Sequence, residues 1–129
     1  LGNDDFLPAV LVLLYTLRRF STVERDFVVL VSSAVSQPVQ ERLARECVRA
    51  IVIDPFEGNE LARQLVSKSA RYSSGYWVVK MYVWRFEEYR KAVFLDADIY
   101  VRHDPDALFC AATSSEVPIG VTPRSTVES

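Results

Sequence analysis

Two aspartates interrupt an apolar stretch in the second half of the chain. Asp96 and Asp98 lie within VFLDADIYV, residues 93–101. Residues i and i+2 of an extended chain face the same side, so the spacing predicts that both carboxylates point the same way. Because two like charges this close repel each other, the pair favours a cation between them. Carboxylate oxygens suit Mg²⁺ or Mn²⁺, and such an ion would bridge a diphosphate and stabilise the charge that develops as the diphosphate leaves.

Spacing alone leaves three interpretations open. In the first, one aspartate caps a turn and the other is solvated at a strand end, since short motifs match by chance. In the second, the pair holds a metal against a nucleotide sugar. In the third, an apolar run followed by Asp-x-Asp supplies the nucleophile and the acid of an aspartyl phosphohydrolase. The position of the pair inside a run built for burial favours a functional role over turn capping.

The residues before the pair predict the elements that position it. Residues 92–95 are apolar, with β-branched and aromatic side chains, as in a central strand. The carboxylates would then lie at the carboxyl end of that strand, where open α/β sheets bind their ligands. A long aromatic helix is predicted just upstream, from about Tyr76 to Tyr89, and it carries Lys80 near its start.

Helices and strands alternate along the rest of the chain. The pattern predicts, in order, a helix from residue 5 or 6 to Arg19, a strand at 26–33, a helix that Ser36 caps, a strand at 50–54, a short helix at 59–66, a polar loop at 67–75 and, after the aspartate pair, a helix capped by Asp104-Pro105 and a strand at 117–121. Such alternation favours a doubly wound α/β fold with a mostly parallel sheet. Because an α/β domain would want a strand just upstream of the first helix, we expect the fold to be partial.

The composition is that of one globular domain. The 129 residues are 50% hydrophobic and 25% charged, so a sizeable core can form. The formal net charge of −2 excludes the overall basic field typical of nucleic-acid-binding proteins. The longest apolar run, residues 7–17, is too short to span a bilayer. Cys47 and Cys110 lack the spacing of a zinc site or a disulfide framework, and we expect them to be buried free thiols.

A longer block around the aspartates carries a family resemblance. Residues 80–109 read KMYVWRFEEYRKAVFLDADIYVRHDPDALF. This block resembles the core signature of the family 8 glycosyltransferases, the glycogenin and galactinol synthase group, in which a lysine helix with Trp and Tyr leads into apolar-Asp-Ala-Asp and then a turn ending in Asp-x-Leu-Phe. The opening GNDDFLPAVLVLLYTLRR and the later DFVVLVSSAVS are similar to the first loop and helix and to the second strand of that family. The resemblance covers essentially the whole chain.

The resemblance implies a Rossmann-like GT-A nucleotide-diphospho-sugar transferase fold, with residues 1–129 as a single domain that forms its N-terminal nucleotide-binding portion. It also implies transfer of a hexosyl group from a UDP-sugar to a carbohydrate or glycosylated-protein acceptor, with retention and with Mn²⁺ (or Mg²⁺) as cofactor. The family's later metal-binding His and its acceptor motifs lie downstream of these residues. We therefore expect a donor half-site that is incomplete by itself. Whether it acts in the cytosol or in the secretory lumen is not predicted.

Carried over by position, the resemblance assigns roles to the aspartate pair. Asp96 and Asp98 would bind the metal and the diphosphate, and the backbone of Ala97 would lie close to the nucleotide. Asp98 and Lys80 are the expected catalytic residues.

Four further positions match the family's donor site. Asn3 and Phe6 would contact the nucleotide from the first loop, with Phe6 stacking on uracil. Lys80 would approach the donor phosphates or sugar from near a helix N-terminus, where the dipole favours anions. Arg71 would close a flexible loop onto the diphosphate.

Each of these side chains has a structural alternative. Phe6 could be a core residue, Arg71 a solvated loop charge and Lys80 a snorkelling surface lysine. His103, the single histidine, lies beyond the predicted strand and off the family's ligand position, and we expect it to be solvated. The aromatic residues of the lysine helix are expected mostly to pack against the sheet: Tyr76, Trp77, Tyr82, Trp84, Phe86 and Tyr89.

Two other functions remain as alternatives to the transferase. An aspartyl phosphohydrolase of the haloacid dehalogenase type would carry a small residue and Thr after the pair, early in its domain, whereas Ile99 and Tyr100 follow here, late in the chain. A truncated or inactive UDP-sugar-binding module would keep the donor half-site without turnover.

Overall fold

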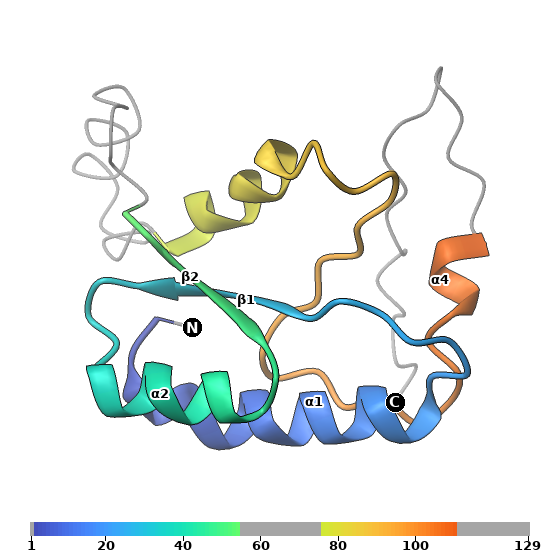
Figure 1. Ribbon diagram of the computed structural model, residues 1–129, viewed down its shortest axis with the longest axis horizontal. Helices are drawn as coiled ribbons and strands as arrows, with labels where there is room; N and C mark the ends of the chain where they lie inside the picture. Colours follow the sequence, from blue (N-terminus) through green and yellow to red (C-terminus); the bar gives the residue numbers. More distant parts are fainter. Residues whose placement is uncertain (1, 55–75, 111–129) are drawn as a thin grey trace, which may run out of the picture.

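The structure is a computed structural model that describes residues 2–54 and 76–110 of the chain. Its elements, in chain order, are η1 (Asp4–Phe6), α1 (Leu7–Phe20), β1 (Val28–Ser32), α2 (Gln37–Arg45), β2 (Arg49–Ile53), η3 (Tyr76–Arg85) and α4 (Ala107–Cys110). Here η denotes a 3₁₀ helix. Figure 1 shows their arrangement, with residues 86–106 running from η3 to α4 without a regular element.

A β-α-β unit forms the centre of the described fold. β1 and β2 are parallel, in a register that runs from Val28 opposite Arg49 to Ser32 opposite Ile53. The connection between them contains α2, as a parallel pair requires a crossover. In Figure 1, α1 and α2 lie together on one side of the strand pair and η3 lies on the other.

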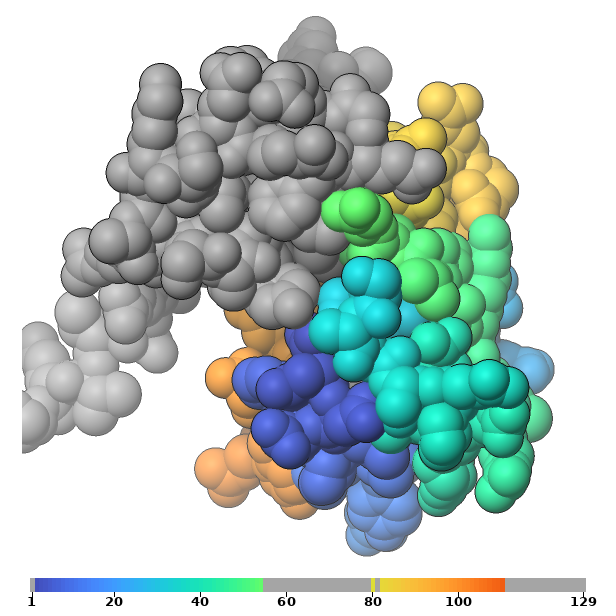
Figure 2. Space-filling model, turned by 90° about the vertical axis from the view of Figure 1, so that its left-hand side faces the viewer, coloured from blue at the N-terminus to red at the C-terminus, as the bar shows by residue number. Residues whose placement is uncertain are grey.

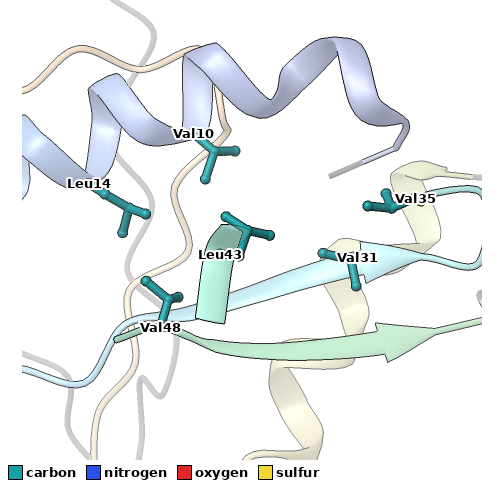
Figure 3. Close-up of a cluster of buried hydrophobic side chains, with 6 residues drawn as sticks. All are labelled: Val10, Leu14, Val31, Val35, Leu43 and Val48. Atoms are coloured by element: carbon teal, nitrogen blue, oxygen red, sulfur yellow. The ribbon is translucent and has the colours of Figure 1, made fainter. Parts of the chain in front are cut away.

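The core lies between the two helices and the strands. Figure 3 shows Val10 and Leu14 on α1 pointing toward Leu43 of α2. The buried cluster also contains Val31, Val35 and Val48. Leu43 and Val31 have no exposed surface at all. Apolar side chains at positions i and i+4 of α1 thus build the face that packs on the sheet.

Truncating Leu43 tests this core. We expect Leu43→Ala to lower the free energy of unfolding by about 2–5 kcal/mol, because the lost methyl groups leave a cavity in a fully packed site. Val12→Ala is the matched control, since Val12 is 48% exposed on α1, and it should change stability by no more than about 0.5 kcal/mol. Urea unfolding of the full-length protein measures both. Equal losses for the two variants would contradict this description of the core.

The first four predicted elements are confirmed, as is the α/β fold class. Ser36 occupies the N-cap position of α2, but its side chain makes no capping hydrogen bond. Pro8 lies in the first turn of α1, and Arg18 and Arg19 lie in its last turn. The strand predicted at 26–33 is the shorter β1, and the strand predicted at 50–54 is β2, shifted by one residue toward the N-terminus. The helix predicted from Tyr76 to Tyr89 is the 3₁₀ helix η3, which ends at Arg85.

The strand predicted at the aspartate pair is wrong. Residues 91–96 have no regular structure, and Ala97 and Asp98 form a turn in which the Ile99 amide donates to the Asp96 carbonyl at 3.1 Å. A strand needs a neighbour that takes up its backbone hydrogen bonds. Within the described residues, β1 and β2 pair only with each other, so this apolar run has no strand beside it.

The prediction of two buried thiols is also wrong. Cys47 is exposed because α2 ends at Arg45, and Cys47 follows it in the left-handed region at φ 53°. Cys110 is exposed at the end of α4. The helix predicted at 59–66, the loop at 67–75 and the strand at 117–121 lie outside the described residues.

None of the helices within the described ranges is long and apolar enough to cross a membrane.

Candidate donor-binding site

The turn at Ala97 presents two carboxylates to solvent. Asp96 and Asp98 are both exposed, whereas Ala97 between them packs against the hydrophobic core cluster. The small side chain at position 97 therefore lets the turn lie close to the core. Because the backbone turns here, the argument that an extended chain places both carboxylates on one face does not apply.

Lys80 lies directly at this turn. Its ammonium is 2.8 Å from Oδ1 of Asp96 and 2.9 Å from Oδ2. The same ammonium is 5.6 Å from the centroid of the Phe94 ring. Both partners of the ion pair are half-exposed, and exposed pairs contribute no more than about 1 kcal/mol, so a competing ion can displace either partner.

One cavity brings most of the predicted site residues together. It has a volume of about 750 Å³, within the range typical of ligand sites. Its wall is largely apolar and comes from α1, β1 and the 91–98 segment. Five residues predicted for the donor site line it: Phe6, Lys80, Asp96, Ala97 and Asp98.

The first loop reaches the same cavity at the carboxyl end of β1. The Ser32 hydroxyl donates to the Gly2 carbonyl at 2.7 Å, and both residues line the cavity. Asp4 accepts a hydrogen bond from the Ser36 amide at 2.8 Å, just before α2. On the face shown in Figure 2, the N-terminal residues (dark blue) lie beside the residues that follow β1 (cyan) and part of the 91–105 segment (orange). Open α/β sheets bind ligands at this end of their strands.

Phe6 is 48% exposed, which removes the alternative that it is a core residue. Lys80 is the fifth residue of η3, beyond its first turn, so the helix dipole contributes little there, contrary to our expectation. Asn3 is not part of the cavity wall, and its amide donates to Oδ2 of Asp5 at 3.2 Å. Arg71 lies outside the described residues. His103 is exposed, as expected.

The aromatic side chains after Lys80 pack partly on one another. Tyr82 and Phe86 make an edge-to-face contact with ring centroids 6.0 Å apart, and Phe86 contacts Tyr89 at 6.1 Å in the same way. Trp84, in contrast, is 52% exposed. The expectation that these rings mostly pack inward therefore fails for Trp84.

Sequence reasoning missed the importance of Asp106. Its carboxylate accepts hydrogen bonds from the Thr22 amide at 2.8 Å, the Thr22 hydroxyl at 3.0 Å, the Val23 amide at 3.0 Å and Nε of Arg25 at 2.6 Å. The bond from Arg25 is the largest cause that holds the pKa of Asp106 well below its ordinary value, and the bonds from Thr22 and Val23 act in the same direction. The carboxylate thus stabilises the fold at neutral pH, and this contribution is lost in strong acid as the pH falls through the lowered pKa. The predicted cap beside it is confirmed, because Oδ1 of Asp104 accepts from the Asp106 amide at 2.8 Å.

The donor set at the turn suits a hard divalent cation. Within residues 2–54 and 76–110, no group of three or more His, Cys, Asp or Glu side chains is placed to hold a metal. The two carboxylates at the turn are exposed, and one already holds a cation, the Lys80 ammonium, between its two oxygens. Mg²⁺ and Mn²⁺ accept one or two carboxylates together with water and phosphate oxygens, so these residues fit such an ion.

Comparison with known proteins identifies the family. The family model described as glycosyl transferase family 8 matches residues 1–126. The chain belongs to glycosyl transferase family 8. Membership in family 8 implies the GT-A fold, and the parallel strand pair with its crossover helix agrees with a partial, mixed α/β version of it.

Three relatives of this family-8 chain show how much of a longer protein it corresponds to. It is 34% identical to glycogenin-1 of Caenorhabditis elegans over 107 residues, 83% of the chain and 24% of that protein. It is 30% identical to human glycogenin-1 over 116 residues, 90% of the chain and 32% of that protein. It is 31% identical to galactinol synthase 7 of Arabidopsis thaliana, over 84% of the chain and 31% of that protein. The chain thus spans about a quarter to a third of the length of these relatives.

Proposed function

We propose that the full-length protein is a metal-dependent, retaining glycosyltransferase that transfers a hexosyl group from a UDP-sugar to a carbohydrate or glycosylated-protein acceptor. The observation that carries this proposal is the cavity whose wall contains two carboxylates, a lysine and an exposed aromatic ring. A nucleotide diphosphate sugar has matching parts: a flat base, a charged diphosphate and a polar sugar. Membership in family 8 supports the transferase activity and gives no support to the aspartyl phosphohydrolase.

The carboxylates of Asp96 and Asp98 would hold Mn²⁺ or Mg²⁺. When bound, such an ion neutralises the charge that develops on the departing diphosphate. Both carboxylates are exposed, so binding requires little desolvation of protein groups. The backbone of Ala97, fixed against the core, would lie beside the nucleotide.

Lys80 has two candidate ionic partners, the Asp96 carboxylate and a donor phosphate. Its pairing with Asp96 offsets the charge of that carboxylate. A charged phosphate oxygen, like the Asp96 carboxylate, forms a strong hydrogen bond with an ammonium, so Lys80 would donate to the diphosphate in the donor complex. This makes Lys80 a catalytic residue in the proposal, because it stabilises the leaving group directly.

Phe6 would stack on the uracil base, since an exposed ring on the cavity wall offers a flat apolar face. Asn3 in the same loop and Arg71 complete the proposed donor contacts.

A second candidate is a UDP-sugar-binding module that does not turn over its ligand. The observation that favours it is the Lys80–Asp96 ion pair, because an ammonium already takes up one of the two carboxylates proposed for the metal. Calorimetric titration of UDP into the full-length protein, with and without Mn²⁺, tests the binding that both candidates share. A UDP-sugar transfer assay then separates them.

A further inference from the structure

The segment that carries the aspartate pair is held by individual contacts, among them the packing of Ala97 against the core cluster and the ion pair of Asp96 with Lys80. Between Lys91 and Asp106 it has no regular structure, and no strand of the described part of the chain pairs with it. The Val101 amide donates to the Thr16 hydroxyl at 3.4 Å, which is a long hydrogen bond. Lys91 donates to the Phe109 carbonyl at 2.9 Å and so ties the start of the segment to α4.

The far end of the segment is held much more firmly. The Asp106 side chain is nearly buried, and it accepts four hydrogen bonds from residues 22–25, the connection between α1 and β1. Arg25 makes two contacts across this junction: its Nε donates to Asp106, and its guanidinium carbon lies 3.7 Å from the centroid of the Phe109 ring. Two backbone amides and a hydroxyl of the connection between α1 and β1 complete the junction.

The same cavity extends from this junction to the aspartate turn. Arg25, Pro105 and Phe109 line one part of it, and Asp96 and Asp98 line another. Asp106 is fixed to the connection that follows α1, and the Val101 amide bonds to Thr16 of α1, so residues 101–106 are tied to α1 and its C-terminal connection at two points. A carboxylate turn that must present a set geometry to a metal needs such support.

We infer that Asp106, held by Thr22, Val23 and Arg25, is a positioning residue that sets the placement of the Asp96–Asp98 turn in the donor site. This inference rests on the proposed function for its effect on metal and donor binding. The effect of Asp106 on the placement of the turn does not depend on that function.

The test compares Asp106→Asn with Glu46→Gln in the full-length protein. Asn keeps the shape of Asp106 but loses the charge that Arg25 binds. Glu46 is a matched control because it also pairs with arginines, Arg18 and Arg42, and lies at the end of α2 outside the cavity wall. Hydrogen exchange of the Ile99 and Val101 amides reports on the turn, and titration with Mn²⁺ in the presence of UDP reports on the site.

In Asp106→Asn we expect the two amides to exchange about tenfold faster and the Kd for Mn²⁺ to rise by about tenfold or more, as for residues that orient metal ligands. In Glu46→Gln both should stay at wild-type values. If Asp106→Asn does not fold, Thr22→Val takes its place in the test. This variant removes one hydrogen-bond donor and keeps the charge pair, so it should show the same changes at smaller size.

Wild-type exchange rates in Asp106→Asn, or equal changes in Asp106→Asn and Glu46→Gln, would overturn the inference. Faster exchange at the turn with an unchanged Kd for Mn²⁺ would also overturn it. If the wild-type protein binds neither Mn²⁺ nor UDP, the proposed function fails, and exchange alone then decides: acceleration confined to residues 96–104 supports the positioning role, and unchanged rates reject it.

Discussion

Asp98→Asn is expected to lower the rate of UDP-sugar transfer by the full-length protein by at least about a hundredfold, the usual scale for losing one group that stabilises transition-state charge. Asn has the shape of Asp but lacks the negative charge with which the Asp98 carboxylate would bind a divalent cation. Asp98 is exposed at a turn, so the substitution should leave the fold and the melting temperature unchanged. A lower transfer rate at an unchanged melting temperature would separate a catalytic role of Asp98 from a structural one.

The measurement is a transfer assay with saturating Mn²⁺, combined with thermal unfolding of the same samples. Glu87→Gln is the control, since Glu87 is an exposed carboxylate outside the cavity wall and should behave as wild type. Full activity of Asp98→Asn, or full activity of the wild type in the presence of a chelator, would contradict the assigned role.

Lys80→Ala should affect the binding of Mn²⁺ and the binding of UDP differently. The affinity for Mn²⁺ without nucleotide should stay the same or increase, because the ammonium that competes for the Asp96 oxygens is gone. The affinity for UDP and the transfer rate should fall by about ten- to a hundredfold, because a hydrogen bond to a charged group is worth about 1.5–3 kcal/mol. No purely structural role of Lys80 produces this combination.

Arg85→Ala is the control for Lys80→Ala, since it removes one positive charge from the same 3₁₀ helix outside the cavity wall. Calorimetry gives both affinities for each variant. A decrease in Mn²⁺ affinity with unchanged UDP affinity would show that Lys80 supports the turn and does not contact the donor.

Local patterns predicted the elements whose stability is mostly local. Apolar spacing, Pro8 in the first turn and basic residues in the last turn were enough to predict α1. The two β-branched runs that became β1 and β2 are joined by a short amphipathic helix, so the parallel unit followed from the sequence. The end of α2 was less predictable, because Cys47 continues the apolar face of the helix in sequence but takes the left-handed conformation after it.

Long-range pairing explains what could not be predicted. The run before Asp96 has the composition of a strand, but a strand also needs a partner, and sequence pattern carries no information on whether one is adjacent. The partners of Asp106 lie 81 to 84 residues upstream, with no local signal that connects them. The prediction that Lys80 and the aspartate pair belong to one site came from the family resemblance. The structure brings Lys80 and Asp96 into contact.

The most direct test of the central claim is the affinity of the full-length protein for UDP with and without Mn²⁺, measured by calorimetry at fixed ionic strength. If Asp96 and Asp98 bind a metal that contacts the diphosphate, Mn²⁺ should increase the UDP affinity by about tenfold or more, and Asp98→Asn should remove this increase. Equal UDP affinities with and without Mn²⁺, or the absence of UDP binding under both conditions, would contradict the proposed donor site.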